Sequence, residues 1–143
     1  GSCVAVCLHD PISRVGGMNH FLLPGRMSDA GRNNSHGVHS MELLINQLIR
    51  LGGKKDRMVA RVFGGANMLN NEMSVGERNG KFALEFLEAE GIEVLGSSLG
   101  GNRARRIRFW PDIGKAQQKF AQDEVMEKLE VPAPAPTSDI ELF

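Results

Sequence analysis

The chain of 143 residues lacks the features that mark several large classes of protein. It has no tyrosine and one tryptophan, which argues against an aromatic platform on which nucleic-acid bases could stack. Its 17 basic and 17 acidic residues cancel, so no excess charge attracts nucleic acid or an anionic membrane. Two cysteines are too few for a disulfide framework, and no apolar run approaches the ~20 residues of a membrane span. These absences predict a soluble protein of the reducing cytoplasm.

What is present is typical of one globular domain that mixes helices with strands. Hydrophobic residues make up 41% of the chain, enough for a packed core. Apolar runs and turn residues predict strands at 4–9, 18–23, 58–63, 92–95 and 103–110. Helical spacing predicts helices at 40–51 and 74–90, with a polar loop over 25–39. This order predicts an α+β fold, a layered α/β sandwich with mixed β-sheets.

The chain changes character after Phe120. We therefore expect a globular domain over residues 1–120 and a C-terminal tail over 121–143. The segment V-P-A-P-A-P at 131–136 is typical of a stiff, extended chain. The tail is either a disordered end or a docking peptide that adds to a partner's groove or sheet edge.

The first two strands can bring a thiol and an imidazole together. If they form a hairpin around a four-residue turn at 11–14, residues pair when their numbers sum to 25, and His20 lies opposite Ala5. Cys3 and Cys7 are then both diagonal neighbours of His20, at roughly 7–8 Å by backbone. A thiolate attacks a carbonyl carbon, and an imidazole that takes the thiol proton produces the thiolate. The hairpin therefore predicts a nucleophilic site, with two inert core thiols as the alternative.

The surroundings of the two cysteines differ, although spacing alone does not choose between them. Cys7 lies in mid-strand between Val6 and Leu8, where a cysteine usually behaves as a small buried hydrophobe. Cys3 lies at the strand entrance after Ser2, where backbone N–H groups can face an oxyanion and a substrate can approach. Cys3 is the candidate nucleophile on these grounds.

The sequence predicts no metal site and no cofactor site. His36 and His39 lie in the predicted polar loop without further ligands at zinc spacing. None of the Gly-Gly pairs belongs to a phosphate-binding pattern, so we interpret them as tight turns. Residues 103–110 alternate basic with apolar side chains, so that Arg106 and Arg108 would share one face of the strand while Ile107 and Phe109 face inward. This favours a solvated strand face over a surface for an acidic partner.

Five segments, in order, resemble the chemoreceptor glutamine deamidase family, CheD. They are G-S-C-V-A-V-C-L-H-D-P with G-G-M-N-H-F-L-L-P at the start, M-E-L-L-I-N-Q-L at 41–48, R-V-F-G-G-A-N-M at 61–68, V-G-E-R-N at 75–79 and G-G-N-R-A-R-R-I-R-F at 100–109. One such motif would be weak evidence. Their shared order over most of the chain is a strong match.

The resemblance implies a sandwich like that of a bacterial toxin deamidase, and hydrolysis of specific glutamine side-chain amides on methyl-accepting chemotaxis receptors. Cys3 would attack the amide carbon, and His20 would accept its proton and pass one to the departing ammonia. The family also implies a catalytic threonine and a first strand in a part of its sequence that precedes Gly1. Further candidates for the substrate pocket are Ser2, Asn19, Arg78, Asn79, Gly100 and Gly101. The alternative for the last four of these is a structural role, in capping a helix or forming a turn.

The same resemblance implies the receptors as protein substrate and a chemotaxis phosphatase, CheC, as a further partner. The alternative function is a non-catalytic module that binds CheC or receptors. A cysteine peptidase would share the nucleophile but would release new amino termini instead of ammonia. We expect no nucleic-acid partner and no insertion into a membrane.

Overall fold

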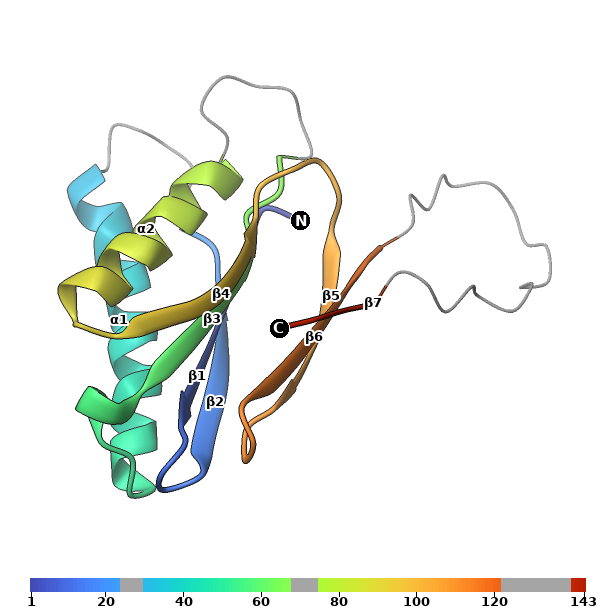
Figure 1. The fold of residues 1–143 in the computed structure, drawn as a ribbon. Coiled ribbons are helices and arrows are strands. Elements are labelled where there is room, and N and C mark those ends of the chain that lie inside the picture. Colours follow the sequence, from blue (N-terminus) through green and yellow to red (C-terminus); the bar gives the residue numbers. More distant parts are fainter. Residues whose placement is uncertain (24–29, 68–74, 122–139) are drawn as a thin grey trace.

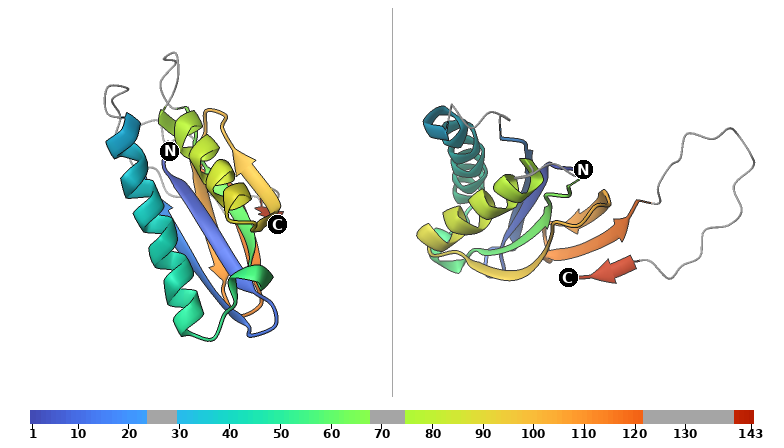
Figure 2. Two further views of the ribbon diagram at one scale, coloured as in Figure 1. Left: turned by 90° about the vertical axis from the view of Figure 1, so that its left-hand side faces the viewer. Right: turned by 90° about the horizontal axis from the view of Figure 1, so that it is seen from above.

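The computed structural model describes residues 1–23, 30–67, 75–121 and 140–143. In this part of the chain, helices α1 (Ala30–Arg50) and α2 (Val75–Ala89) cover one face of a four-stranded sheet (Figure 1). A three-stranded sheet covers the other face, and the two views of Figure 2 show the three layers from the helix side and from above. The predicted layered α+β sandwich is confirmed.

The four-stranded sheet has the order β2-β1-β3-β4 and is mixed, as predicted. β1 is antiparallel to β2 and β3, whereas β3 and β4 run parallel because α2 connects them. The second sheet is antiparallel, in the order β5-β6-β7. The strands are β1 (Val4–Asp10), β2 (Val15–Phe21), β3 (Val59–Gly64), β4 (Glu93–Leu99), β5 (Arg105–Trp110), β6 (Lys115–Phe120) and β7 (Ile140–Leu142), and a 3₁₀ turn, η2 (Lys55–Arg57), precedes β3.

The β1–β2 hairpin has the register that the sequence predicts. Residues 11–14 form the turn, and Ala5 pairs with His20. Side chains alternate between the faces of a sheet, so Cys7 lies on the same face as Ala5 and His20. Cys7 packs with residues of the second sheet, whereas Val6 packs in the core beneath the helices. The candidate catalytic face of the hairpin is therefore the one turned toward the second sheet.

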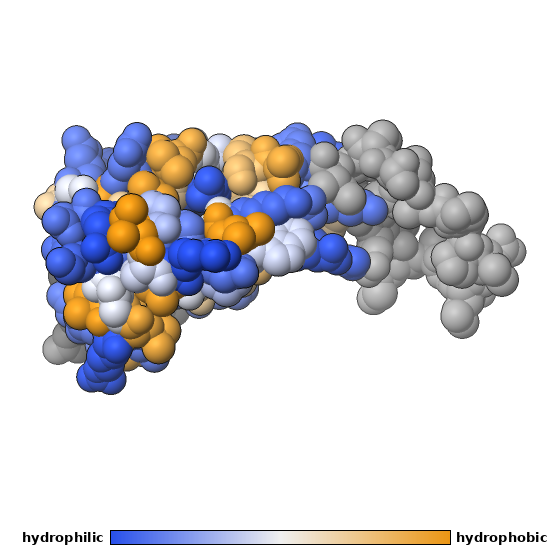
Figure 3. All heavy atoms as spheres, turned by 60° about the horizontal axis from the view of Figure 1, so that its bottom comes forward, coloured by the Kyte–Doolittle hydropathy of each residue, from blue (hydrophilic) through white to orange (hydrophobic). Residues whose placement is uncertain are grey.

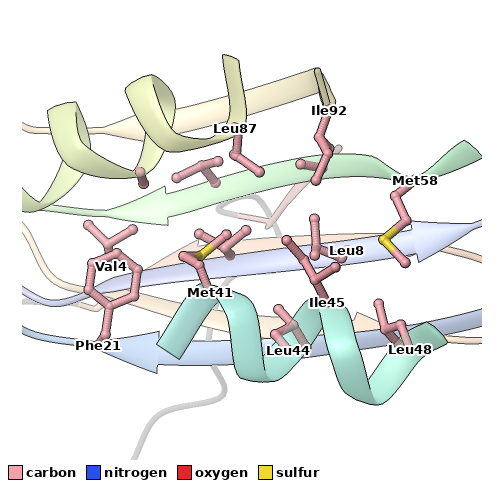
Figure 4. Close-up of a cluster of buried hydrophobic side chains, with 14 of the residues drawn as sticks. Val4, Leu8, Phe21, Met41, Leu44, Ile45, Leu48, Met58, Leu87 and Ile92 are labelled. Atoms are coloured by element: carbon pink, nitrogen blue, oxygen red, sulfur yellow. The ribbon is translucent and has the colours of Figure 1, made fainter. Parts of the chain in front are cut away.

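The main core lies between the helices and the four-stranded sheet (Figure 4). Val4 and Leu8 of β1 and Leu87 of α2 are fully buried there. Burying an aliphatic side chain of this size stabilises a fold by roughly 1.5–3 kcal/mol. α1 faces the sheet with side chains that recur at helical spacing, and these are Met41, Leu44, Ile45 and Leu48.

The predicted loop over 25–39 is wrong for residues 30–39, which belong to α1, and Ser40 lies inside the helix instead of capping it. The polar composition of the segment suggested a loop, but tertiary packing overrides weak helix propensity. Gly37 is the point of close packing. A side chain there would lie 2.6 Å from the Phe82 ring of α2 and 2.7 Å from Leu23, so glycine lets the helix approach both.

Other predicted elements are displaced or incomplete. β2 covers 15–21 instead of 18–23, and Leu51 is exposed because α1 ends at Arg50. β6 was not predicted, because its sequence K-A-Q-Q-K-F lacks apolar alternation. It is nevertheless inward-facing at Ala116 and Gln118, which are both buried. β5 agrees with its prediction, since Arg106 and Arg108 are exposed on its outer face.

The end of the chain adds a strand to the chain's own second sheet. β7 pairs with β6, and the backbone N–H of Phe143 donates to the Ala116 carbonyl at 3.0 Å. The Phe143 ring meets the Phe63 ring edge-on, with 5.3 Å between centroids. The sequence offered a partner's sheet edge as one destination for the tail, and residues 140–142 occupy an edge within the molecule. Residues 122–139, including V-P-A-P-A-P, lie outside the described residues.

The surface at the end of the molecule opposite the N-terminus carries hydrophobic side chains separated by hydrophilic ones (Figure 3). Ile12 and Ile113 lie in two of the turns and are 71% and 54% exposed. Neither α1 nor α2, among the residues described, is long and apolar enough to cross a membrane.

A buried carboxylate ties the β1–β2 turn to the segment before β3. Asp10 is 0% exposed. Its Oδ1 accepts hydrogen bonds from the Ile12 and Ser13 N–H groups, and its Oδ2 accepts from the Lys54 N–H and the Arg57 guanidinium, which is 2.8 Å away at Nη2. Burial by itself would raise the pKa of Asp10, but these donors together hold it well below its usual range.

Asp10→Asn is expected to lower the free energy of unfolding at pH 7 by about 2–4 kcal/mol, because it leaves Arg57 without its anionic partner. The native pKa lies below the unfolded value of ~3.9, so the stabilisation is present above that pH and is lost as the pH falls. Urea unfolding at neutral and acid pH checks this. Asp56→Asn, at an exposed position of η2, is the control. Equal stability of the two variants would contradict the role of Asp10.

Candidate active site

The residues before β1 are held by the backbone that follows β3. The Gly65 N–H donates to the Cys3 carbonyl at 2.8 Å, and the Ala66 N–H donates to the Gly1 carbonyl at 3.0 Å. Gly64 has a φ of 113°, and a side chain on it would overlap the Cys3 carbonyl oxygen. A residue without a side chain is therefore required where β3 passes the candidate nucleophile.

A second turn and an arginine support this junction. The Gly100 N–H donates to the Gly64 carbonyl at 3.0 Å, and the Gly101 carbonyl accepts from the Asn67 N–H at 2.7 Å. Arg105 of β5 donates through Nη1 to the carbonyls of Gly64, at 3.2 Å, and Gly100, at 2.9 Å. The guanidinium therefore joins the second sheet to the turns that surround Cys3, and burial lowers its pKa.

Sequence reasoning missed Arg105, because it assigned Arg106 and Arg108 to the solvated face of this strand and gave Arg105 no role. The strand alternation carries the missing signal. Arg106 and Arg108 point outward, so Arg105 shares the parity of Ile107, which packs against the buried cluster between the sheets. An arginine on the inward face of a strand needs partners, and here they are backbone carbonyls and the Ser98 hydroxyl, 3.0 Å from Nε.

The hairpin brings Cys3 toward His20. Val4 pairs with Phe21 on one side and with Gly64 on the other, and Cys3 continues the pairing with β3 through its bond from Gly65. Cys3 directly precedes the pair of Val4 with Phe21, so it follows β1 toward the position diagonal to His20, which in an uninterrupted ladder would lie roughly 7–8 Å away by backbone. Cys3 is half-buried and His20 is exposed, so both are accessible from solvent.

Cys7 has a different environment from Cys3. It is 2% exposed and packs with Phe63 between the sheets. Burial raises the pKa of the Cys7 thiol to about 12, against a smaller lowering by the charge of Arg61. Cys7 is therefore protonated near neutral pH and is a poor nucleophile.

Asn79 of α2 joins the two strand ends that carry these residues. It is 0% exposed, its Nδ2 donates to the Ser2 carbonyl at 2.8 Å, and its Oδ1 accepts from the Leu23 N–H at 3.0 Å. Arg78 lies beside it on α2 and is half-buried. Asn79 thus contacts Ser2 directly, and Cys3 is the next residue of the chain.

Asn19 faces away from this cluster, toward α1. Its Oδ1 accepts from the Val6 N–H at 3.1 Å, and its Nδ2 donates to the Ser40 hydroxyl at 3.3 Å. Consecutive residues of a strand point to opposite faces, so Asn19 lies on the helix side of β2 and His20 on the other.

A surface cavity of about 720 Å³ lies beside the junction, between α2 and the turn after β4. Gly65, whose N–H holds the Cys3 carbonyl, is in its wall together with Gly100 and Gly101. Leu84 and Leu99 add apolar surface, and Glu85 and Glu88 add charge. Within the described residues, no three His, Cys, Asp or Glu side chains gather as metal ligands would.

Comparison with known proteins identifies the family of the chain. Residues 22–120 match the family model described as CheD chemotactic sensory transduction. A protein of Agrobacterium fabrum named "Probable chemoreceptor glutamine deamidase CheD" is 49% identical, over 100% of this chain and 83% of its own length. Proteins of the same name from Rhizobium rhizogenes (46% identical, over 100% and 83%) and Rhizobium leguminosarum bv. trifolii (51%, over 82% and 66%) are also similar.

The family model begins its match after Cys3 and His20, but two of these alignments include the whole chain and therefore both residues. The family model matches residues 22–120, and these two relatives are 49% and 46% identical over the whole chain. On this evidence, the chain belongs to the CheD family.

Proposed function

We propose that the chain is a glutamine deamidase that hydrolyses glutamine side-chain amides of chemoreceptors to glutamate and ammonia, with Cys3 as nucleophile and His20 as general base and acid. The names of its relatives support the reaction and the class of substrate. The observation that supports the two residue roles is the hairpin register, in which Ala5 pairs with His20 and Cys3 lies two residues before Ala5, beyond the last pair of Val4 with Phe21.

The reaction has two steps. In the first, His20 takes the thiol proton and the Cys3 sulfur forms a bond to the amide carbon, which gives a tetrahedral oxyanion. When this intermediate collapses, the carbon–nitrogen bond breaks and His20 gives the proton to the leaving nitrogen. Ammonia departs, and the acyl group remains on the Cys3 sulfur as a thioester. In the second, a water molecule gives a proton to His20 and attacks the thioester carbon, so that glutamate and the free thiol are released.

The surroundings of the two residues suit a protein substrate. A glutamine on the surface of a receptor must reach the nucleophile from outside, and the half-buried Cys3 and the exposed His20 allow this. Gly65 donates a hydrogen bond to the Cys3 carbonyl, and Asn79 donates one to the Ser2 carbonyl. These bonds fix the backbone on both sides of the Cys3 α-carbon. A nucleophile positioned in advance lowers the entropic part of the barrier.

We also propose that the enzyme works in the cytoplasm. Both cysteines are free thiols in the structure. A thiol nucleophile requires a compartment that keeps it reduced, and the cytoplasm does so.

Cys3→Ala is expected to reduce ammonia release from a chemoreceptor fragment by about 10³-fold or more, because the remaining thiol, Cys7, is buried and protonated. Mass spectrometry of the fragment identifies the glutamines that become glutamates. Cys7→Ala, which removes a buried thiol, is the control and should retain activity. Undiminished release by Cys3→Ala would refute the proposed mechanism.

The same assay separates the competing functions. A module that only binds receptors or the phosphatase CheC would release no ammonia even as the unaltered protein. A cysteine peptidase would produce new amino termini in the fragment while its glutamines stayed intact.

His20→Asn is expected to lower the rate of deamidation by about 10²–10⁴-fold, the usual contribution of a positioned acid and base. Binding of the receptor fragment should change little, since proton transfer by the imidazole acts on the chemical step and not on binding. Steady-state kinetics gives both quantities. A rate within about threefold of the unaltered protein would remove His20 from the mechanism.

Iodoacetamide is expected to alkylate Cys3 of the native protein at least about tenfold faster than Cys7 near neutral pH. Cys3 is half-buried, whereas Cys7 is 2% exposed and burial raises its pKa to about 12. Mass spectrometry of peptides resolves the two sites over time. Denaturation in urea is the control and should bring the two rates together. Faster labelling of Cys7 in the native protein would contradict the assignment.

A further inference from the structure

Asn79 occupies the place where the β1–β2 ladder would make its next hydrogen bond. The pairing of Val4 with Phe21 puts Ser2 opposite Leu23 in the same register. The Cys3 carbonyl faces β3, where it accepts from Gly65. Alternate residues of a strand direct their N–H and C=O groups to opposite edges, so the Ser2 carbonyl faces β2. A continuous ladder would join it directly to the Leu23 N–H.

The structure instead shows the carboxamide of Asn79 between these two groups. Its oxygen accepts from the Leu23 N–H at 3.0 Å, and its nitrogen donates to the Ser2 carbonyl at 2.8 Å. A direct bond would hold the backbone nitrogen and oxygen about 2.9 Å apart. Two bonds in series with an amide group between them keep the strand ends farther apart, while both backbone groups remain paired.

Each strand end carries one of the proposed catalytic residues close to this insertion. Cys3 follows Ser2 directly, and His20 lies three residues before Leu23. The separation set at Asn79 therefore influences the distance between thiol and imidazole and the space beside Cys3 into which a glutamine side chain must fit. A misplacement of about 1 Å can cost ~10²-fold in rate.

The carboxamide is itself held in one orientation. Asn79 is 0% exposed, and the next turns of the same helix bury Ala83 and Leu87 in the main core. An amide offers one acceptor and one donor side by side, which is what the Leu23 N–H and the Ser2 carbonyl require. Since both ends are engaged with backbone, the side chain acts on the site through the two strands.

We propose that Asn79 is a positioning residue of the deamidase, whose carboxamide spaces the ends of β1 and β2 so that Cys3 and His20 can act on one substrate amide. This inference rests on the proposed function of Cys3 and His20. It concerns how far apart the two strands are held, and not which groups react.

Two substitutions of Asn79 by residues of similar shape, leucine and aspartate, test the proposal. Asn79→Leu removes both hydrogen bonds, and we expect kcat per folded molecule to fall by about 10²-fold while KM changes by less than about threefold. Leu87→Ala, a fully buried position two turns along the same helix, is the control. It weakens the packing of α2 without touching the strand ends, so its kcat per folded molecule should equal that of the unaltered protein.

Asn79→Asp adds a readout that a general loss of stability would not produce. A protonated carboxyl can accept from Leu23 and donate to Ser2 as the amide does, whereas a carboxylate can only accept. Burial raises the pKa of a carboxyl group. The ratio of the kcat of this variant to that of the unaltered protein should therefore be highest at low pH and fall as the carboxyl ionises. Both rates are corrected for the folded fraction at each pH.

The outcomes distinguish this proposal from the function on which it depends. If Cys3→Ala is inactive but Asn79→Leu keeps kcat within about twofold, the positioning role is refuted and the proposed function stands. If Leu87→Ala loses as much kcat as Asn79→Leu, the effect belongs to helix packing and the proposal also fails. Should Asn79→Leu not fold, the Asn79→Asp ratio decides, and a ratio that is independent of pH refutes the role. Activity in Cys3→Ala would instead refute the proposed function.

Discussion

Backbone pairing on both edges of β1 controls the geometry of the candidate site. On one edge, β1 pairs with β2 so that Ala5 lies opposite His20, and on the other it pairs with β3 as far as the bond between Gly65 and Cys3. Because side chains alternate, this register assigns Val4 to the core beneath the helices and Cys7 to the layer between the sheets. A slip of one residue would exchange these faces and separate Cys3 from His20. The main core opposes such a slip, since it would expose the apolar side chains that now face the helices.

Beyond Val4 the ladder gives way to individually placed groups. The N–H of Gly65 and the carboxamide of Asn79 take over the hydrogen bonds of the Cys3 segment. Arg105 then joins these turns to the second sheet through the carbonyls of Gly64 and Gly100. Each group gives a hydrogen-bond partner to a backbone atom at the end of a strand or in a turn. The ladder between β1 and β2 can therefore end beside the candidate catalytic residues without the cost of unpaired polar groups.

The layers on the two faces of the four-stranded sheet differ in kind. Beneath the helices, long aliphatic side chains form one continuous core. Between the sheets, the buried cluster is small and consists of Cys7, Phe63 and Ala116, with Phe143 at the end of the chain packed against it. The larger core carries most of the hydrophobic stabilisation, since that scales with the apolar area removed from water. The face with Cys3 and His20 can therefore hold polar and reactive groups.

The sequence by itself determined the features that depend on neighbours along the chain. The turn at 11–14 and the two short strands predicted the pairing of Ala5 with His20, and helical spacing predicted the buried face of α1 from Met41 to Leu48. Series of motifs also predicted the family to which the chain belongs. These features follow from local periodicity and turn length, which a sequence displays directly.

Only the tertiary structure decided the contacts that join distant segments. The bonds of Asn79 span 56 and 77 residues, and those of Arg105 reach back 41 residues to Gly64. The close approach of Gly37 in α1 to Leu23 and Phe82 likewise joins segments that are distant in sequence. The strand β6 is recognised only from its pairing with β5 and β7. Local patterns state which way a side chain faces, but the group that meets it there is chosen by the packing of the whole chain.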